Sequence, residues 1–455
     1  MPSVAIVGAG LAGLVAAYEL SKQGFDVTML EASGRVGGVI QSVRKDGYLV
    51  EYGPNTIQNR GDALNRLIDA LELDDEVIEA SPAAKKRYVV RNSTLHPVPS
   101  SPPALLTSRL FSMSAKLRLL REPFLPKVAS ADEETVADFV RRRLGQEFLD
   151  YAVNPFIAGI YAGDPEELSI QHAFPTLYAL EQQHGSLLGG QIKQMRAARN
   201  NAPPGQKRRM FSFRDGIQAL PNALCSHFTG KLNLNSVVTS ISQVNGMWNV
   251  IYTHEGREEE LITHAILWAA PLHGLSDVDV QTWIDLSPLR EVVYAPVSIV
   301  ALGYEANNVA HPLDGFGVLV PEREEGFHIL GALFSSTLFP DRAPEGCVLL
   351  TTFLGGQRHP HLVRLSDEHL IQTAQQNLGK LLGIRGEPEF TNIVRWERAI
   401  PQYRKGYGAV KQTIERLEQE HRGLYLAGNF RNGISVSDTT ATAIDVAQRI
   451  IEASY

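Results

Sequence analysis

The feature that most constrains this chain is a glycine-rich turn placed directly after its first apolar run. Ser3–Val7 predicts a short buried strand, and Gly8–Gly13 follows it as Gly-Ala-Gly-Leu-Ala-Gly before an apolar helical pattern begins. In such a turn Gly8 permits the tight bend, Gly10 lets the backbone approach a pyrophosphate, and Gly13 lets the helix pack on the sheet. Free N–H groups at the helix start would bind the phosphates. The turn therefore predicts a Rossmann-like domain that binds a dinucleotide.

The residues after the second predicted strand narrow the cofactor. Asp26–Leu30 predicts that strand, and Glu31 follows it at the spacing from the glycine turn where a ribose hydroxyl needs an acceptor. Residues 31–38, Glu-Ala-Ser-Gly-Arg-Val-Gly-Gly, resemble an extension found in FAD-dependent amine oxidases and their relatives. The resemblance implies FAD rather than NAD, held in part by Arg35 and the paired glycines.

Composition excludes several other classes of function. The formal net charge of −7 argues against a nucleic-acid-binding protein. Cys225 and Cys347 lie far apart and form no Cys-x-x-Cys pair, which argues against a disulfide framework and against a zinc or iron–sulfur site. No apolar run approaches the length that a spanning helix needs and the first strand begins at once, so we expect no spanning helix, no signal peptide and a cytoplasmic protein.

Basic residues are distributed unevenly along the chain. Residues 80–121 hold eight Lys or Arg and no acid, and residues 182–214 are also free of acids. The pattern predicts contact with an anionic partner. Within the first stretch an apolar stripe at helical spacing is flanked by basic residues, and it favours equally a core-facing helix and an interfacial helix on anionic lipid. The stripe consists of Leu106, Leu110, Met113, Leu117 and Leu120, and the flanking residues are Arg109, Lys116, Arg118 and Arg121.

The C-terminal region supplies a second element of the predicted cofactor site. Leu424–Asn429 ends a buried strand, and residues 433–438 open the last helix, with Ser437 or Asp438 as its expected N-cap. A helix start aimed at the pyrimidine edge of a flavin would stabilise negative charge on the reduced ring. Helices are also expected at 61–73, 133–144, 147–154, from 215, and at 367–382.

Several longer segments extend the resemblance to essentially all 455 residues. Residues 154–165, 351–356 and 396–403 are the most specific of them, and residues 51–56, 85–89 and 315–321 add to the match. The chain resembles the oxygen-dependent protoporphyrinogen oxidases. That resemblance implies the six-electron oxidation of protoporphyrinogen IX to protoporphyrin IX by oxygen through non-covalent FAD, with release of hydrogen peroxide, in haem biosynthesis.

The predicted elements interleave, which implies discontinuous domains. We expect an α/β (α+β) fold in which a Rossmann-like FAD domain is built from residues 1–60, 211–275 and 390–455. An antiparallel-sheet substrate domain would be built from residues 61–91 and 276–389. Residues 92–210 would form a helical insertion that associates peripherally with an anionic membrane.

The resemblance also implies roles for individual residues. Asn55 and the backbone of Gly159 would face the reacting tetrapyrrole, Arg87 would pair with a propionate, and Leu319, Leu333 and Phe353 would clamp the rings. The FAD-binding set would be Gly8, Ala9, Gly10, Leu11, Ala12, Gly13, Glu31, Ala32, Arg35, Gly38, Gly53, Pro54, Asn55, Thr56, Val238, Trp396, Ile434, Ser435 and Val436. A flat apolar wall with a cation at its rim suits a macrocycle that carries carboxylates.

Two alternatives stay open at this point. A coproporphyrinogen III oxidase would share the fold, but the resembling members of that branch lack an arginine at the position of Arg87. Rab-escort and GDP-dissociation-inhibitor-like proteins are a non-enzymatic alternative, since they keep the fold as a binding scaffold without flavin. The expected partners are a porphyrinogen, molecular oxygen and an anionic membrane surface, and a homodimer is left open.

Overall fold

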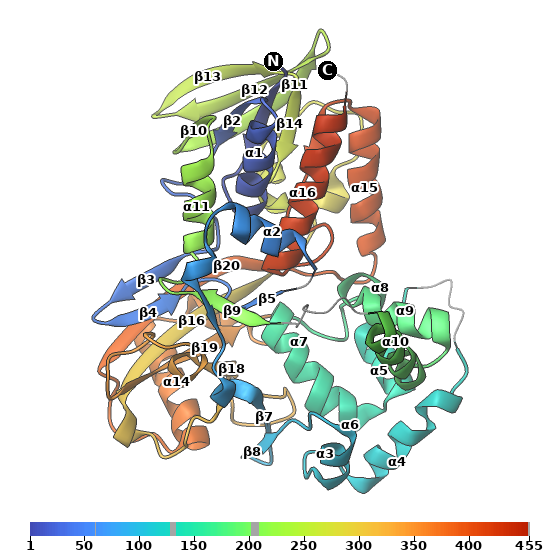
Figure 1. The fold of residues 1–455 in the computed structure, drawn as a ribbon, viewed down its shortest axis with the longest axis vertical. Helices are drawn as coiled ribbons and strands as arrows, with labels where there is room; N and C mark the ends of the chain where they lie inside the picture. Colours follow the sequence, from blue (N-terminus) through green and yellow to red (C-terminus); the bar gives the residue numbers. More distant parts are fainter. Residues whose placement is uncertain (60, 128–132, 202–208, 454–455) are drawn as a thin grey trace.

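The computed structural model describes residues 1–59, 61–127, 133–201 and 209–453, and all structural statements below concern these residues. Figure 1 shows three regions: a parallel sheet with its helices at the top, a large antiparallel sheet below it, and a group of helices beside that sheet. Both chain ends lie at the top. We call the group of helices between residues 102 and 201 the helical insertion.

The top region is built around a five-stranded parallel sheet with the strand order β10-β2-β1-β14-β21. Residues that alternate along β1 sort onto two apolar cores: Val4 and Ile6 pack toward one face, and Ala5 and Val7 toward the other. Such strands, buried on both faces, give the near-continuous apolar runs seen in the sequence. The strands are β1 Ser3–Val7, β2 Asp26–Leu30, β10 Lys231–Asn233, β14 Ala265–Trp268 and β21 Leu424–Leu426.

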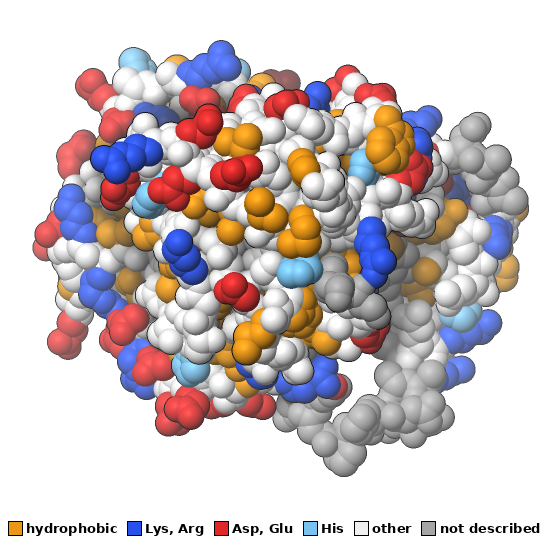
Figure 2. Space-filling model, turned by 90° about the horizontal axis from the view of Figure 1, so that it is seen from above, with side chains coloured by type: hydrophobic (Ala, Val, Ile, Leu, Met, Phe, Trp, Pro, Cys, Tyr) orange, Lys and Arg blue, Asp and Glu red, His pale blue; other side chains and the backbone are white. Residues whose placement is uncertain are grey.

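Helices from distant parts of the chain cover this sheet. Helices α1, α11 and α16 pack on one face, and α15 packs on the other together with a four-stranded sheet of order β13-β12-β11-β15. The helices are α1 Leu11–Lys22, α11 Ala219–His227, α15 Tyr407–Glu420 and α16 Val436–Glu452; the strands are β11 Ser236–Val244, β12 Met247–His254, β13 Arg257–Thr263 and β15 Asp279–Val280. The face seen in Figure 2 mixes acidic and basic side chains without a patch of one sign.

The lower region is a seven-stranded sheet with the order β20-β16-β19-β18-β17-β7-β8. Helix α14, at Asp367–Leu382 as predicted, packs on one face, which we call the back face. Strand β20 pairs with β16, so residues 390–401 lie in this sheet although the sequence prediction assigns them to the FAD domain. The strands are β7 Lys86–Arg91, β8 Thr94–Pro97, β16 Tyr294–Glu305, β17 Gly315–Leu319, β18 Ile329–Phe334, β19 Cys347–Gly355 and β20 Phe390–Pro401.

Shorter elements join the two sheets. Strands β3 and β4 form a hairpin, and β5, β9 and β6 form a three-stranded sheet. Their bounds are β3 Ser42–Lys45, β4 Tyr48–Glu51, β5 Ile57–Gln58, β6 Val77–Glu79 and β9 Met210–Phe213, with helix α2 at Ala63–Ala70 between β5 and β6 and helices α12 Ser287–Arg290 and α13 Ser335–Leu338 later in the chain.

The helical insertion has an apolar core and, within it, a network of buried charges. Arg143 is fully buried and bonds the carboxylates of Glu181 (Nε to Oε1, 2.8 Å) and Glu122 (3.4 Å). Arg142 bridges Glu134 and Glu181, and Glu122 accepts the backbone N–H groups of residues 187 and 188. The helices are α3 Pro102–Thr107, α4 Met113–Arg121, α5 Val136–Arg143, α6 Gln146–Phe148, α7 Asn154–Tyr161, α8 Ile170–Ala173, α9 Pro175–His184 and α10 Leu187–Asn201, with a π-helical turn at Leu149–Val153.

The apolar stripe at 106–120 does not form a single helix, so that prediction is wrong. Helix α3 ends at Thr107, and α4 starts after Ser112, whose Oγ accepts the N–H of Ala115 at 3.2 Å. Leu110 lies in the intervening turn and is buried, but the other four residues of the stripe are more than half exposed. Lys116, expected on a solvated basic face, is buried and donates to the carbonyls of Leu106 and Ser108.

Other predicted helix boundaries differ in smaller ways. The last helix has Ser435 as its N-cap instead of Ser437 or Asp438, because the Ser435 Oγ accepts the N–H of Asp438 at 3.1 Å. The helix expected from residue 215 begins at Ala219, since Gly216 takes a positive φ of 91°. Residues 200–205, Asn-Asn-Ala-Pro-Pro-Gly, predict a loop from their composition, and most of them lie outside the described ranges. Among the described residues no helix is both long enough and apolar enough to span a bilayer.

Candidate functional site

The three glycines of the first turn differ in the space around them. Gly8 has a φ of 102°, which favours glycine, and a Cβ on Gly13 would lie 2.0 Å from the carbonyl oxygen of Gly8. Gly10 is open, since the nearest atom to a Cβ there would be the Cα of Gly38 at 4.0 Å. Gly10 is the N-cap of α1 and provides no side-chain cap. The first turn of α1 therefore presents its N–H groups beside an uncrowded backbone, which is a suitable cradle for a pyrophosphate.

A second loop closes this cradle. The backbone of Gly37 pairs with that of Gly10, and the N–H of Gly37 donates to the carbonyl of Ala9 at 2.8 Å. Arg35 holds the loop in shape by donating to the carbonyl of Gly38 at 2.6 Å. The carboxylate of Glu31 accepts the N–H of Ala9 at 2.7 Å, so it lies at the end of β2 beside the glycine turn. The predicted residues 8–13, 31, 32, 35 and 38 thus lie together.

The loop at 53–56, which joins β4 to β5, and the C-terminal segment approach from other parts of the chain. A Cβ on Gly53 would lie 2.1 Å from the carbonyl oxygen of Val39, so the loop touches the backbone next to Gly38. Asn55 donates to the carbonyl of Gly53 at 3.0 Å, and the indole N–H of Trp396 donates to the carbonyl of Tyr52 at 2.6 Å. These bonds link β20 to the loop at 53–56, where the sequence predicts the flavin ring.

Two further predicted positions complete the cofactor set. Val238 is buried on β11, where the pairing with β12 is irregular between residues 238 and 240. Residues 434–436 form the start of α16, which is anchored to β5 because the Ser437 hydroxyl donates to the carbonyl of Gln58 at 2.5 Å. The donors and the crowded glycine backbone in these segments fit a dinucleotide with a long pyrophosphate bridge.

The predicted substrate residues share one face of the seven-stranded sheet, which we call the front face. Leu319 pairs with Gly331, which pairs with Phe353, and Leu333 is two positions along β18 from Gly331. Because paired residues point the same way and alternate residues share a face, these three side chains line one wall. Arg87 pairs with Gly317 and so joins the same face, as does Trp396 through its pairing with Val297.

Helix α7 lies over this wall. A Cβ on Gly159 would lie 2.8 Å from the Cδ2 of Leu319, so the helix backbone approaches the sheet closely at that point. Leu319, Leu333 and Phe353 are half-buried, and Gly159 is exposed. The structure therefore brings Gly159 to Leu319 and leaves apolar side chains partly uncovered on the front face.

Arg87 differs from its charged neighbours. Lys86 forms an ion pair with Asp314, whereas the exposed Arg87 guanidinium lies over the ring of Phe316 at 5.0 Å from its centroid and contacts no carboxylate among the described residues. A guanidinium at the rim of an apolar wall can bind a carboxylate with two parallel hydrogen bonds.

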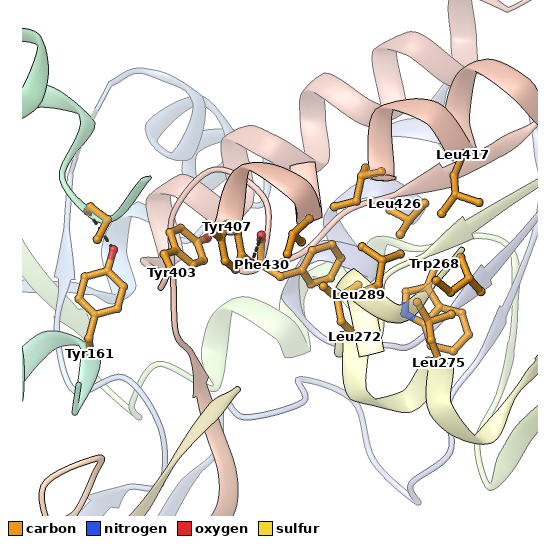
Figure 3. Close-up of a cluster of buried hydrophobic side chains, with 14 of the residues drawn as sticks. Tyr161, Trp268, Leu272, Leu275, Leu289, Tyr403, Tyr407, Leu417, Leu426 and Phe430 are labelled. Carbon is orange, nitrogen blue, oxygen red and sulfur yellow. Dashed lines mark hydrogen bonds between the residues drawn. The ribbon is translucent and has the colours of Figure 1, made fainter. Parts of the chain in front are cut away.

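A row of buried tyrosines, which the sequence analysis missed, supports the C-terminal segment. Figure 3 shows Tyr161, Tyr403 and Tyr407 in a row that ends near Phe430. Tyr403 and Tyr407 stack with centroids 4.4 Å apart, and the Tyr403 hydroxyl donates to the carbonyl of Asn429 and accepts the N–H of Gly433 at 3.1 Å. Burial raises the pKa of Tyr403 well above its usual range, so it stays a neutral donor. Tyr403 lies inside residues 396–403, one of the segments that carry the family resemblance. That position could have identified it as a site residue from the sequence.

A buried ionisable pair beside Asn55 was also missed. Glu51 ends β4 and lies 3.9 Å from Arg342, and both are nearly fully buried. Burial raises the pKa of Glu51 to about 7, against the lowering effects of Ser42 and Arg342. Within the described residues no three His, Cys, Asp or Glu side chains gather as metal ligands would.

Comparisons with known proteins agree with this geometry. The model of the family described as flavin containing amine oxidoreductase matches residues 11–451. Protoporphyrinogen oxidase 2 of Arabidopsis thaliana is 37% identical, over 98% of this chain and 93% of that protein. Coproporphyrinogen III oxidase of Bacillus subtilis is 30% identical, over 96% of this chain and 95% of that protein. A crystal structure from Exiguobacterium sp. 255-15 has the same fold, with a TM-score of 0.83 and 24% identity, over 99% of this chain and 98% of that one.

Proposed function

Since this chain belongs to the family of flavin-containing amine oxidoreductases, we propose that it binds FAD without a covalent link and oxidises a porphyrinogen with molecular oxygen. The observation that carries the proposal is the front face. It combines the half-buried side chains of Leu319, Leu333 and Phe353 with the backbone of Gly159 on one side and the cation of Arg87 at its rim. A large apolar ring system that carries carboxylates is complementary to such a wall.

The residues present fit FAD. The start of α1 and the loop at 35–38 would hold the pyrophosphate, and Glu31 would accept ribose hydroxyls. Residues 53–56, Trp396 and the start of α16 would surround the ring. When bound, FAD supplies a two-electron acceptor that oxygen can reoxidise. The chain's own contribution is to bind and orient the substrate and to remove protons from it.

Protoporphyrinogen IX is the substrate that we favour, and the residue that favours it is Arg87. Protoporphyrinogen has two propionates and coproporphyrinogen has four, so the second needs more cations around the ring. The front face offers Arg87, whereas Lys86 is already paired with Asp314. Coproporphyrinogen III is the second candidate substrate, because the relative from Bacillus subtilis is a coproporphyrinogen III oxidase.

A direct assay separates these possibilities. The purified protein is expected to be yellow and to release its flavin on acid precipitation. In an oxygen electrode it should consume three oxygen molecules per protoporphyrin formed and should prefer protoporphyrinogen over coproporphyrinogen in kcat/KM. A colourless protein that takes up no added FAD would contradict the cofactor proposal. A preference for coproporphyrinogen, or for a primary amine, would contradict the substrate proposal.

We also propose that the outer side of the helical insertion rests on an anionic membrane surface. Helices α3 and α4 and the turn that follows expose large apolar side chains that a protein surface rarely leaves uncovered together. These side chains are Leu106 at 62%, Met113 at 65%, Leu117 at 56%, Leu120 at 62% and Phe124 at 86% exposure. The basic residues of the same stretch would add electrostatic attraction to the lipid.

Liposome flotation at low and high salt tests this second proposal. Wild-type protein should float with anionic vesicles at low salt and less at high salt. Replacing Leu117 and Leu120 together by Gln should abolish flotation. Ile262 is 59% exposed on β13, at the opposite end of the molecule, so Ile262→Gln is the matched control and should float normally. Absence of wild-type flotation at low salt would leave a protein that binds no membrane.

A further inference from the structure

Glu51, just before the loop at 53–56, carries a buried carboxyl group. None of the proposed contacts with the cofactor or the substrate uses this group. Glu51 is 4% exposed, its Oε1 accepts the N–H of Ile217 at 3.0 Å, and its Oε2 accepts the hydroxyl of Ser42 at 2.5 Å. The nearest cation in the described part of the chain is Arg342, at 3.9 Å, and its guanidinium is directed mainly to the Ser212 hydroxyl and nearby carbonyls. Glu51 is therefore buried, accepts hydrogen bonds from Ile217 and Ser42, and forms no bidentate ion pair with Arg342.

A small cavity lies beside Glu51 and reaches Asn55 and Thr351. It has about 10 Å³ of free volume, which is close to the minimum for one water molecule. Thr351 lies on the front face, since it pairs with Leu333 and is two positions along β19 from Phe353. The cavity is lined by Leu49, Glu51, Asn55, Ser335, Leu338, Phe339, Arg342 and Thr351. Thr351, at one end of the front face, thus lines the same space as Glu51 and Asn55.

The proposed reaction needs a proton acceptor, so this inference rests on the proposed function. In each two-electron step a C–H bond at a bridging carbon of the porphyrinogen breaks, and the hydrogen leaves with both electrons to the flavin. A proton must also leave in each step: in two of the three steps a pyrrole N–H bond breaks, and in the remaining step a C–H bond at the last bridging carbon breaks, so that four C–H and two N–H bonds are broken in all. In each case the electron pair stays in the macrocycle. Oxygen finally takes up two electrons and two protons and departs as hydrogen peroxide. The apolar side chains of the wall itself cannot accept the proton that leaves in each step.

We propose that Glu51 accepts this proton through one water in the cavity beside Asn55 and returns it to solvent along Ser42. Ser42 is half-exposed, and its neighbourhood reaches the surface at the ion pair between Arg44 and Asp215. Asn55, Ser335 and Thr351 can orient the water because they combine donors and acceptors. Glu51 reaches the substrate only through that water, so it acts as a proton relay.

The electrostatic surroundings suit a group that must gain and lose a proton near neutral pH. Burial raises the pKa of Glu51 to about 7, while Ser42, Arg342 and the N–H of Ile217 act in the opposite direction. The charged groups around the Glu51–Arg342 pair are Arg44, Asp215 and Asp341. Arg342 donates to Ser212 and to the carbonyls of residues 213 and 214, so it remains a cation that supports the ionised form of Glu51.

The test compares wild type with Glu51→Gln, which keeps the shape and the acceptor for Ile217. The rate of flavin reduction by protoporphyrinogen, measured without oxygen, should rise with pH in wild type, with a midpoint near 7. In Glu51→Gln it should fall by at least about tenfold and lose that dependence, while KM stays within about twofold. Equal rates in both proteins across this range would overturn the proposal. A wild type that reduces no flavin with any porphyrinogen would instead contradict the proposed function.

Two measurements do not depend on Glu51→Gln folding well. Ser42→Ala removes a hydrogen bond to the ionised carboxyl, so the midpoint of the wild-type pH profile should move to higher pH. Difference infrared spectra of the wild-type protein should show a buried carboxyl band that titrates near pH 7 and moves to higher pH in Ser42→Ala. An unshifted midpoint in Ser42→Ala, or no such band in the wild type, would count against Glu51.

Discussion

The parallel sheet and the helical insertion both have apolar cores, but the insertion's core also contains a charge network around a fully buried arginine. The sheet places apolar side chains on both faces, so many small contacts share its stability. The insertion has an apolar core as well, but in addition it buries Arg143 between Glu122 and Glu181, with Arg142 and Glu134 completing a charge network. A buried charge network is costly to desolvate and depends on every partner being present. The insertion should therefore respond sharply to single changes that the sheet would tolerate.

The largest expected effect comes from removing the central charge of this network. Arg143→Met should destabilise the insertion by about 3–5 kcal/mol, because it leaves Glu122 and Glu181 buried and short of a partner. Hydrogen exchange should become faster in α5 and α9 and stay unchanged in β1 and β14. In the sheet, Ile6→Val is the matched control and should cost about 0.5–1.5 kcal/mol. Similar losses from both variants would show that the two regions do not differ as described.

The two regions should also respond to pH in opposite directions. The pKa of Glu51, which lies against the sheet region, is raised to about 7, so its contribution to stability is present below about pH 4.5 and is lost as pH rises toward 7. Glu51→Gln should therefore gain stability relative to wild type between pH 5 and pH 8, by up to about 3 kcal/mol. Urea unfolding at both pH values measures this difference. A constant difference between the proteins would contradict the raised pKa.

In the insertion, burial works to raise the pKa of Glu181, but hydrogen bonds from Arg142 and Arg143 outweigh it and the pKa is lowered. This contribution is present above the unfolded-state pKa and is lost as pH falls through the folded-state value. Helices α5 and α9 should hence loosen first on acidification, which hydrogen exchange corrected for intrinsic rates can follow. Uniform loosening of sheet and insertion would argue against this assignment.

Arg87 contrasts with the buried arginines of the insertion, because it makes no ion pair with the described residues and lies over the ring of Phe316. Arg87→Ala should leave stability and FAD content nearly unchanged. It should lower kcat/KM for protoporphyrinogen, chiefly through KM, by an amount equivalent to about 1.5–3 kcal/mol. Steady-state kinetics and a thermal melt on the same samples test both parts. Unchanged kinetic constants would indicate that Arg87 is an ordinary surface cation.

The smallest expected effects come from two serine N-caps, one in each region. Ser435 caps α16 and Ser112 caps α4, with Oγ to N–H distances of 3.1 and 3.2 Å. Replacing either by Ala should cost about 1 kcal/mol. Each serine hydroxyl also donates to a carboxylate at 2.5 Å, Ser435 to Asp438 and Ser112 to Glu147. Ser112→Ala should cost more, since Glu147 also forms an ion pair with Arg91. A larger loss in Ser435→Ala would reverse that order.

Features with a local sequence signal are the ones that the sequence predicts most accurately. The glycine turn, the strand at 26–30 and the helix at 367–382 follow from periodicity and from residues that adjoin in the chain. The 106–120 stripe was misassigned because spacing alone does not show that Ser112 starts a new helix. The last helix had three closely spaced capping residues in Ser435, Ser437 and Asp438, and the choice depended on backbone geometry and on the bond from Ser437 to Gln58.

The unpredicted parts of the candidate site depend on contacts between distant residues. Glu51 and Arg342 lie far apart in the chain, and their burial follows from how the hairpin at 42–51 packs between the two sheets. In the sequence, residues 141–143 look like an ordinary run of solvent-exposed charges. Their spacing does not show that Arg143 is buried with Glu181. Family segments placed Asn55, Gly159 and Phe353, but only the strand register shows that Phe353, Leu319 and Leu333 share a face.

The order of strands in the parallel sheet has a consequence for biosynthesis. Strand β1 leaves the ribosome well before its neighbour β14, which begins at Ala265, and before β21, which lies on the far side of β14 and begins at Leu424. Helix α16, which packs against α1, is made after all three. The glycine turn must therefore wait until these later elements have been made before its supporting sheet is complete. The nascent chain would expose apolar strands during that time, and chaperones and an early supply of FAD should have their greatest influence then.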